Sequence, residues 1–143
     1  KIFIDYAHTP DALQKALQTL KGKTDGKLIC VFGCGGNRDT GKRKEMAIAA
    51  SKFADMSIVT SDNPRNENPK KIIREISKYM KGSCSIEIHR DKAIEKAIQL
   101  AHKEDVILIA GKGHEKYQEI KGIKYPFSDQ KCVRNALKHH KIS

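Results

Sequence analysis

Two short segments of this chain carry side chains suited to binding both ends of an amino acid. Asp62-Asn63-Pro64-Arg65 follows the apolar run Met56–Val59. Arg65 offers a planar guanidinium for a carboxylate, and Asn63 offers both a donor and an acceptor. Asp and Asn before Pro are also common in ordinary turns, so this segment alone leaves a turn and a ligand site both open.

The second segment is Gly111-Lys112-Gly113-His114-Glu115, which follows the apolar run Val106–Ala110. Its glycines permit close approach of the backbone, and Glu115 supplies an acceptor for an ammonium group. A guanidinium in one loop and a carboxylate in another are the pair that a zwitterionic amino acid requires. The alternative for this segment is an ordinary glycine turn.

A third segment, Asp5-Tyr6-Ala7-His8, presents a carboxylate, a phenol and an imidazole after the apolar run Ile2–Ile4. Thr9 and Pro10 follow, and they are typical of a helix N-cap and first helical position. Because helix N-termini attract anions, this segment is suited to a phosphate group. For His8 alone, a histidine that simply lies at a helix start is an equal alternative.

The fourth segment, Gly33–Arg43, is rich in glycine, and Gly36–Lys42 satisfies the spacing GxxxxGK of a phosphate-binding loop. Arg43 occupies the position where such a loop has Ser or Thr to bind magnesium, which disfavours a nucleotide-hydrolysing P-loop. We expect instead a flexible cationic loop that brings Arg38, Lys42 or Arg43 to an anion.

Alternating strands and helices must position these segments. The predicted strands are Ile2–Ile4, Leu28–Phe32, Met56–Val59, Ile86–Ile88 and Val106–Ala110. The predicted helices are Pro10–Leu20, Lys44–Phe53, Pro69–Met80, Asp91–His102 and Asp129–His139. This order predicts a Rossmann-like α/β fold, with a mostly parallel, doubly wound sheet of about six strands and helices on both faces. Ligands of such sheets bind at the carboxyl ends of the strands, where all four segments lie.

The last part of the chain departs from this alternation. Lys116–Ile120 and Ile123–Phe127 flank Lys121-Gly122, which predicts a hairpin or an extension of the sheet. In Phe127-Ser128-Asp129, an N-cap for the last helix and a functional role are equally supported.

Composition restricts the class of protein. The 143 residues are about one domain long, 38% are hydrophobic, and no apolar run approaches the length of a membrane span. The net charge of +11 comes from 28 basic and 17 acidic side chains, and the lysines are scattered without interleaved aromatics. This pattern favours a solvated surface over a nucleic-acid face, although a stand-alone phosphate- or nucleic-acid-binding module is a second hypothesis.

The cysteines and the N-terminus indicate compartment and context. Cys30, Cys34, Cys84 and Cys132 lack paired CxxC spacing, so neither a zinc site nor a disulfide framework is expected. Cys30 and Cys84 lie in apolar strand contexts, which predicts reduced core thiols in a cytoplasmic protein. The chain begins at Lys1 without Met or a signal-peptide pattern, so we expect a fragment of a longer polypeptide.

Together, the four segments resemble the C-terminal domain of the Mur ligases, and within that family the members that add diaminopimelate. The resemblance covers almost the whole chain in order and spacing. It implies one domain over residues 1–143, whose N-terminal UDP-sugar domain and central ATPase domain are absent from this sequence. In the family reaction, ATP with Mg²⁺ converts a substrate carboxylate to an acyl phosphate, which the amine of an amino acid then attacks.

The resemblance also implies roles for particular residues. The expected meso-diaminopimelate-binding residues are Arg38, Asp62, Asn63, Arg65, Gly111 and Glu115. Asp5, Tyr6 and His8 are expected to face ATP. No catalytic residue or metal ligand is implied in this domain, because the family holds Mg²⁺ mainly through its central domain.

The implied substrates are ATP, meso-diaminopimelate and UDP-MurNAc-L-Ala-D-Glu. Lysine-adding members of the family usually lack the arginine found here at Arg65, and a lysine-adding enzyme is the alternative. We expect the chain alone to be an inactive monomer that contacts the missing domains in the full protein and binds neither nucleic acid nor a membrane.

Overall fold

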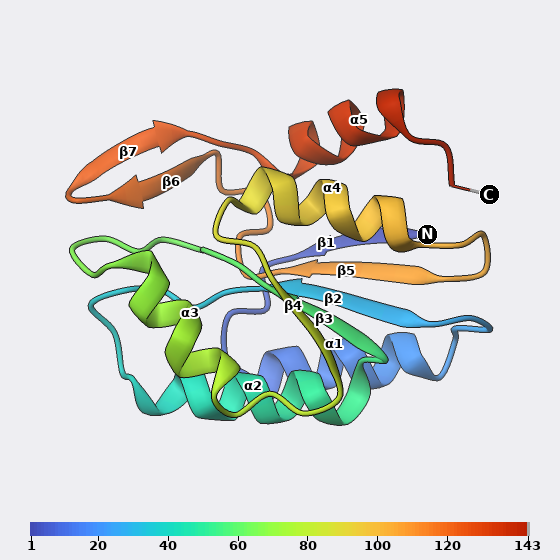
Figure 1. Ribbon diagram of the computed structural model, residues 1–143, viewed down its shortest axis with the longest axis horizontal. Helices are drawn as coiled ribbons and strands as arrows, with labels where there is room; N and C mark the ends of the chain where they lie inside the picture. Colours follow the sequence, from blue (N-terminus) through green and yellow to red (C-terminus); the bar gives the residue numbers. More distant parts are fainter. Residues whose placement is uncertain (143) are drawn as a thin grey trace.

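The computed structural model describes residues 1–142, in which five parallel strands form a central sheet (Figure 1). Its order is β1-β5-β2-β3-β4. The strands are β1 (Ile2–Asp5), β2 (Leu28–Phe32), β3 (Met56–Val59), β4 (Ser83–Ile86) and β5 (Val106–Ala110). Because these strands are parallel, the loops that follow β1, β2, β3 and β5 leave the same edge of the sheet, and β5 lies between β1 and β2.

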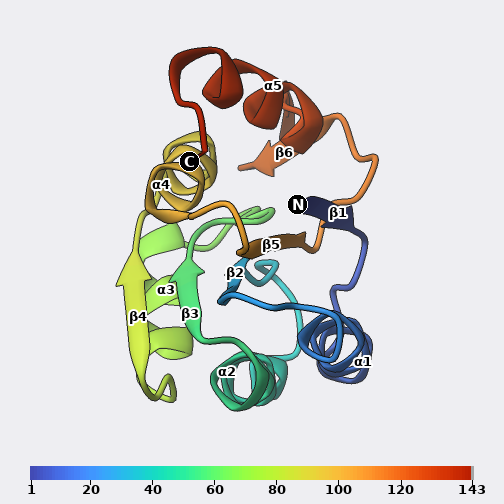
Figure 2. The ribbon, with the colours of Figure 1, turned by 90° about the vertical axis from the view of Figure 1, so that its right-hand side faces the viewer.

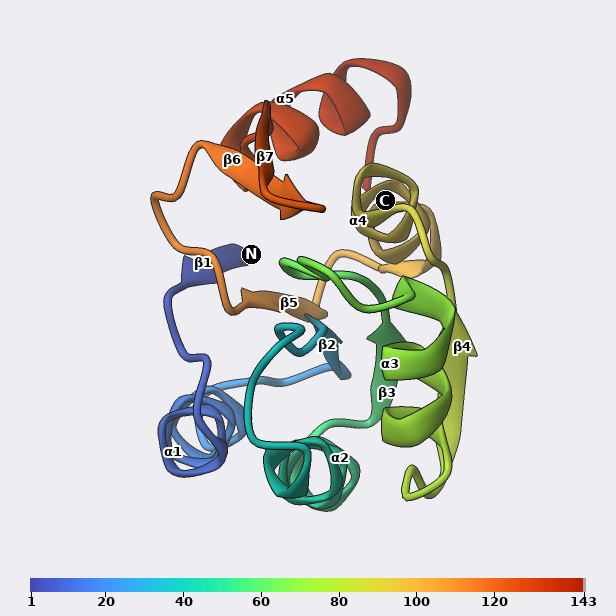
Figure 3. The same cartoon turned by 90° about the vertical axis from the view of Figure 1, so that its left-hand side faces the viewer.

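Helices cover both faces of this sheet (Figures 2 and 3). One face packs against α1 (Pro10–Lys21), α2 (Gly41–Phe53) and α3 (Pro69–Ser77). The other face packs against α4 (Arg90–Leu100) and α5 (Asp129–His139). In β2, Cys30 faces the first layer and Val31 the second, and both are fully buried. Burial on both faces explains the continuous apolar runs of β2 and β5 and confirms the predicted fold class.

The helix starts follow local capping chemistry. Thr9 accepts a hydrogen bond from the Ala12 backbone N–H at 3.2 Å, and Pro10 takes the first helical position of α1. Ser128 caps α5 by accepting from the Lys131 N–H at 3.3 Å, which confirms the N-cap interpretation of this residue.

Three predictions about the elements need correction. The main sheet has five strands, because β6 (Tyr117–Ile120) and β7 (Ile123–Pro126) form a separate antiparallel hairpin, as one of the two alternatives anticipated. The fourth strand is Ser83–Ile86 rather than Ile86–Ile88, since an edge strand paired only with β3 does not need an apolar pattern. Cys84 is exposed on that edge, so its prediction as a core thiol is wrong.

Among residues 1–142, no helix combines the length and apolar character needed to cross a membrane.

Candidate functional site

A cavity of about 220 Å³ opens at the carboxyl edge of the sheet, where the loops after β1, β2, β3 and β5 meet. It is lined by every residue predicted to bind diaminopimelate, and Tyr6 and His8 also line it. The lining residues are Tyr6, His8, Gly33, Cys34, Gly35, Arg38, Asp39, Lys42, Met46, Asp62, Asn63, Arg65, Gly111 and Glu115. The fold therefore brings the four segments to one site.

The end of β1 supplies the rim of this cavity. The rings of Tyr6 and His8 lie with their centroids 4.5 Å apart, and Tyr6 is largely exposed. Asp5 does not line the cavity, because its carboxylate accepts a hydrogen bond from the Ala7 N–H at 2.8 Å and closes the turn after the strand. Of the three residues expected to face ATP, the structure thus places two at the cavity and one beside it.

Arg65 is fixed by its backbone and its side chain. Its backbone φ is 52°, in the left-handed region that non-glycine residues rarely adopt. Hydrogen bonds to the hairpin hold this conformation: the Arg65 N–H donates to the Glu119 carbonyl at 2.9 Å, and the Lys121 N–H donates to the Arg65 carbonyl at 2.8 Å. Arg65 Nη1 donates to the Gly36 carbonyl at 3.1 Å, and Nε lies 3.4 Å from a Glu119 carboxylate oxygen. Within residues 1–142, Nη2 has no hydrogen-bond or ion-pair partner.

Lys112 is a central contact that the sequence predictions missed. Its side chain is fully buried, and Nζ donates to Asn63 Oδ1 at 2.7 Å and to the Tyr117 carbonyl at 2.9 Å. The carboxylates of Asp62 and Glu115 lie 3.3 and 3.4 Å from the same nitrogen. A lysine two residues after the fully buried strand β5 was the available signal, because a lysine there needs acceptors to offset its burial.

The backbone of Gly111 approaches Asp62 closely. Gly111 has a φ of 117°, and a Cβ on this residue would lie 2.6 Å from Asp62 Oδ2. Only glycine tolerates both the conformation and the contact, so the role of Gly111 in the site is to admit the neighbouring carboxylate.

The segment after β2 contributes Arg38, from the loop, and Lys42, from the first turn of α2, to the cavity, but not Arg43. Arg43 is buried in α2, where it donates to Glu75 at 2.6 Å, to Glu67 at 2.9 Å and to the Gly35 carbonyl at 3.3 Å. Of the three cations offered as alternatives for binding an anion, Arg43 is thus engaged by carboxylates of the protein, and Arg38 and Lys42 are the two at the cavity. The hydrogen bond from Arg43, with one from the Asn37 N–H, lowers the pKa of Glu67.

Arg90 and Asp129 form a second buried ion pair that the predictions missed. The guanidinium makes two hydrogen bonds to the carboxylate, at 2.8 and 2.9 Å, and both side chains are fully buried. Arg90 also donates to the carbonyls of Ser61, after β3, and Ala110, at the end of β5, each at 3.1 Å. Arg90 thus connects the carboxyl ends of β3 and β5 to the start of α5 through hydrogen bonds.

Cys34 lies at the wall of the cavity as a protonated thiol. Burial, together with the nearby Asp62 carboxylate, raises the pKa of this thiol to about 12. A thiol with this pKa is a poor nucleophile at neutral pH, so Cys34 contributes surface and not reactivity.

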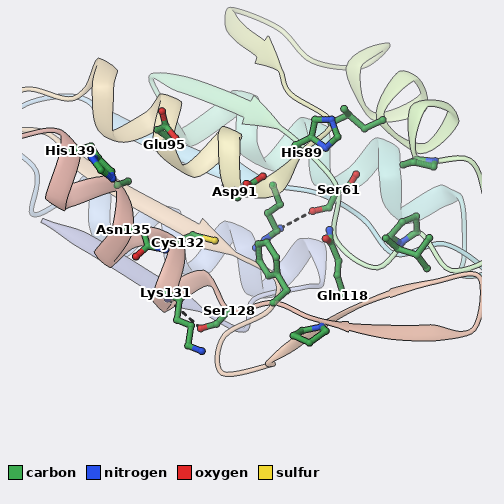
Figure 4. Close-up of a pocket in the computed structure, with 18 residues that line it drawn as sticks. Ser61, His89, Asp91, Glu95, Gln118, Ser128, Lys131, Cys132, Asn135 and His139 are labelled. Carbon is green, nitrogen blue, oxygen red and sulfur yellow. Dashed lines mark hydrogen bonds between the residues drawn. The ribbon is translucent and has the colours of Figure 1, made fainter.

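A larger cavity of about 640 Å³ lies between α4, α5 and the hairpin (Figure 4). His89 at the N-cap of α4, Asp91 from α4, Gln118 from β6, and Lys131 and Asn135 from α5 line it. None of the predicted ligand-binding residues lines it. No group of three or more His, Cys, Asp or Glu side chains in the described part of the chain is arranged to hold a metal ion.

Comparison with known proteins links these features to one family. The family model described as "Mur ligase, glutamate ligase domain" matches residues 1–113. Curated relatives from Aquifex aeolicus and Haemophilus ducreyi, both named UDP-N-acetylmuramoyl-L-alanyl-D-glutamate--2,6-diaminopimelate ligase, are 54% and 56% identical over 138 residues. Each match covers 95% of this chain but only 29% and 28% of the relative, so the chain spans less than a third of their length.

Two solved structures are also similar. A structure of UDP-N-acetylmuramoyl-L-alanyl-D-glutamate--2,6-diaminopimelate ligase has a TM-score of 0.92 and 43% identity, and the match covers 98% of this chain and 30% of that one. A murein peptide ligase from Psychrobacter arcticus has a TM-score of 0.66 at 22% identity, covering 99% of this chain and 28% of that one, which indicates a shared fold.

Proposed function

Because this chain belongs to the Mur ligase family, we propose that it is the amino-acid-binding domain of an ATP-dependent ligase that joins meso-diaminopimelate to UDP-MurNAc-L-Ala-D-Glu. The observation that carries the proposal is the meeting of a guanidinium, Arg65, with the carboxylates of Asp62 and Glu115 in one cavity. The names of the similar proteins support the choice of diaminopimelate.

Both charged groups at the distal end of diaminopimelate have chemically matched partners in this cavity. The distal carboxylate would accept hydrogen bonds from Arg65 Nη2 and Asn63 Nδ2, and Arg38 would pack across it. The distal ammonium would lie between Glu115 and Asp62, close to the backbone of Gly111. Lysine has an ammonium but no carboxylate at this end, so it would leave Arg65 Nη2 without a ligand partner.

The proposed reaction needs more than this chain. ATP with Mg²⁺ would supply the phosphoryl group that activates the substrate carboxylate, and the amine of diaminopimelate would then displace phosphate from the acyl phosphate. Tyr6 and His8, with Asp5 behind them, are proposed to face the nucleotide. The similar proteins are more than three times as long, and we assign the UDP-sugar and ATPase parts to that additional length. The cytoplasmic location and the monomeric state stay predictions.

The test compares amino acids in the full-length enzyme that contains this chain. We expect incorporation of meso-diaminopimelate and an increase in Tm with diaminopimelate but not with lysine. The 143-residue chain alone should show no ATP-dependent ligation. Preferred incorporation of lysine, or ligation by the isolated chain, would contradict the proposal.

A further inference from the structure

The buried ammonium of Lys112 contacts the side chains that bind the ligand in the proposed function, on which this inference rests. We infer that Lys112 is a positioning residue, which orients the Asn63 amide and the Glu115 carboxylate for the incoming amino acid. None of its contacts lies in the central sheet, since its acceptors come from the loops after β3 and β5 and from β6.

Lys112, together with the Glu119 backbone N–H, fixes the orientation of the Asn63 amide. Asn63 Oδ1 accepts from Lys112 Nζ at 2.7 Å and from the Glu119 N–H at 2.9 Å. Both partners are donors, so only the amide oxygen is compatible with this position. The amide nitrogen is therefore directed away from Lys112, where it donates to Glu115 Oε1 at 3.3 Å. This arrangement presents a donor to a ligand carboxylate.

Lys112 also controls the charge of the cavity wall. Its Nζ lies between the Asp62 and Glu115 carboxylates, at 3.3 and 3.4 Å, and reduces the repulsion between them. Glu115 Oε1 is engaged by Lys112 and Asn63, and no partner within residues 1–142 occupies Oε2. The second oxygen is thus held in place for a ligand ammonium.

The burial of Lys112 argues for this role over simple packing. An ammonium is costly to bury, whereas a methionine of similar length would fill the same space at lower cost. The charge of Lys112 matters because its acceptors belong to the proposed site. Three of them are the proposed binding residues Asp62, Asn63 and Glu115. The fourth is a carbonyl of β6, the hairpin strand that holds Arg65.

The experiment measures the KM of full-length Lys112→Met. We expect the KM for meso-diaminopimelate to rise about tenfold or more, as for loss of one buried charged hydrogen bond, while the KM for ATP stays within about twofold. Lys124→Met is the matched control, since Lys124 is exposed on the hairpin and its ammonium lies over the Tyr117 ring, 4.5 Å from the ring centroid. Both KM values should be unchanged in this control. An equal rise in both KM values of Lys112→Met would overturn the inference.

A double-mutant cycle separates positioning from general destabilisation. In an Asn63→Ala background, Lys112→Met should raise the KM for diaminopimelate by no more than about threefold, because the amide that it orients is already gone. Fully multiplicative effects would contradict the inference.

Folding and the proposed function have separate readouts. Lys112→Gln, which keeps a donor without the charge, is the second variant, and failure of both variants to fold would also overturn the inference. If Arg65→Ala leaves the KM for diaminopimelate unchanged, the proposed function fails. If Arg65→Ala raises it and Lys112→Met does not, only the role of Lys112 fails.

Discussion

Replacing Arg65 by alanine in the full-length enzyme gives the most direct test of amino-acid recognition. Truncating one partner of a buried, hydrogen-bonded charge pair costs about 2–5 kcal/mol. The Arg65 side chain is 19% exposed at the cavity rim, so we take the lower part of that range, about 2–3 kcal/mol. This loss corresponds to a rise of about 30- to 150-fold in the KM for meso-diaminopimelate.

The assay varies one substrate at a time with the other two saturating and follows phosphate release. Arg65→Lys should also raise the KM for diaminopimelate by about tenfold or more, because an ammonium cannot replace the two parallel hydrogen bonds of a guanidinium. Arg74→Ala, on the exposed side of α3, is the matched arginine control and should change neither KM. Equal increases in the KM values for ATP and diaminopimelate would refute the reasoning, since Arg65 would then act on the whole domain.

Two further predictions concern ion pairs that the buried arginines Arg90 and Arg43 form near the site. Arg90→Ala should lower the free energy of unfolding in urea by about 3–5 kcal/mol, because it leaves Asp129 buried without its partner. The double variant Arg90→Met with Asp129→Leu should lose much less stability. Similar losses for both variants would argue against an ion-pair effect. The pKa of Glu67 is lowered in the folded state from its ordinary value of 4.5, so its contribution to stability is complete above pH 4.5 and is lost as the pH falls through the lower folded value. In Glu67→Gln, the free energy of unfolding should therefore fall less steeply as the pH is lowered below 4.5. The same pH dependence in the variant and the unaltered chain would contradict this assignment.

The sequence predicted which residues meet at the candidate site, because parallel strands share one carboxyl edge. Once β2, β3 and β5 are recognised as buried strands, the segments that follow them must meet, and the cavity lined by Asn63 and Glu115 follows from that geometry. Strand β4 was misplaced by three residues, because at the sheet edge its pairing with β3, and not a buried apolar face, determines where it begins.

The buried charges could not be predicted in the same way. Arg43 lies 32 residues from Glu75, and Arg90 lies 39 residues from Asp129, so no short-range sequence pattern predicts either pair. In a chain with 28 basic residues, a lysine or arginine in an amphipathic helix is most simply interpreted as solvated. Tertiary packing decided which of these charges became structural.

The hairpin strand β6 contacts the candidate site as closely as the loops of the central sheet do. Its Gln118 side chain donates to the Asp62 carbonyl at 2.8 Å, and the Glu119 N–H donates to Asn63 at 2.9 Å. Glu119 also pairs with Arg65 through its backbone carbonyl and its carboxylate. Because Arg65 keeps a left-handed conformation only while these bonds hold it, a change in the position of β6 would move the guanidinium without altering a residue of the cavity wall. In the proposed function, the central sheet would thus determine where the amino acid binds, and β6 would determine which group of that amino acid Arg65 can reach.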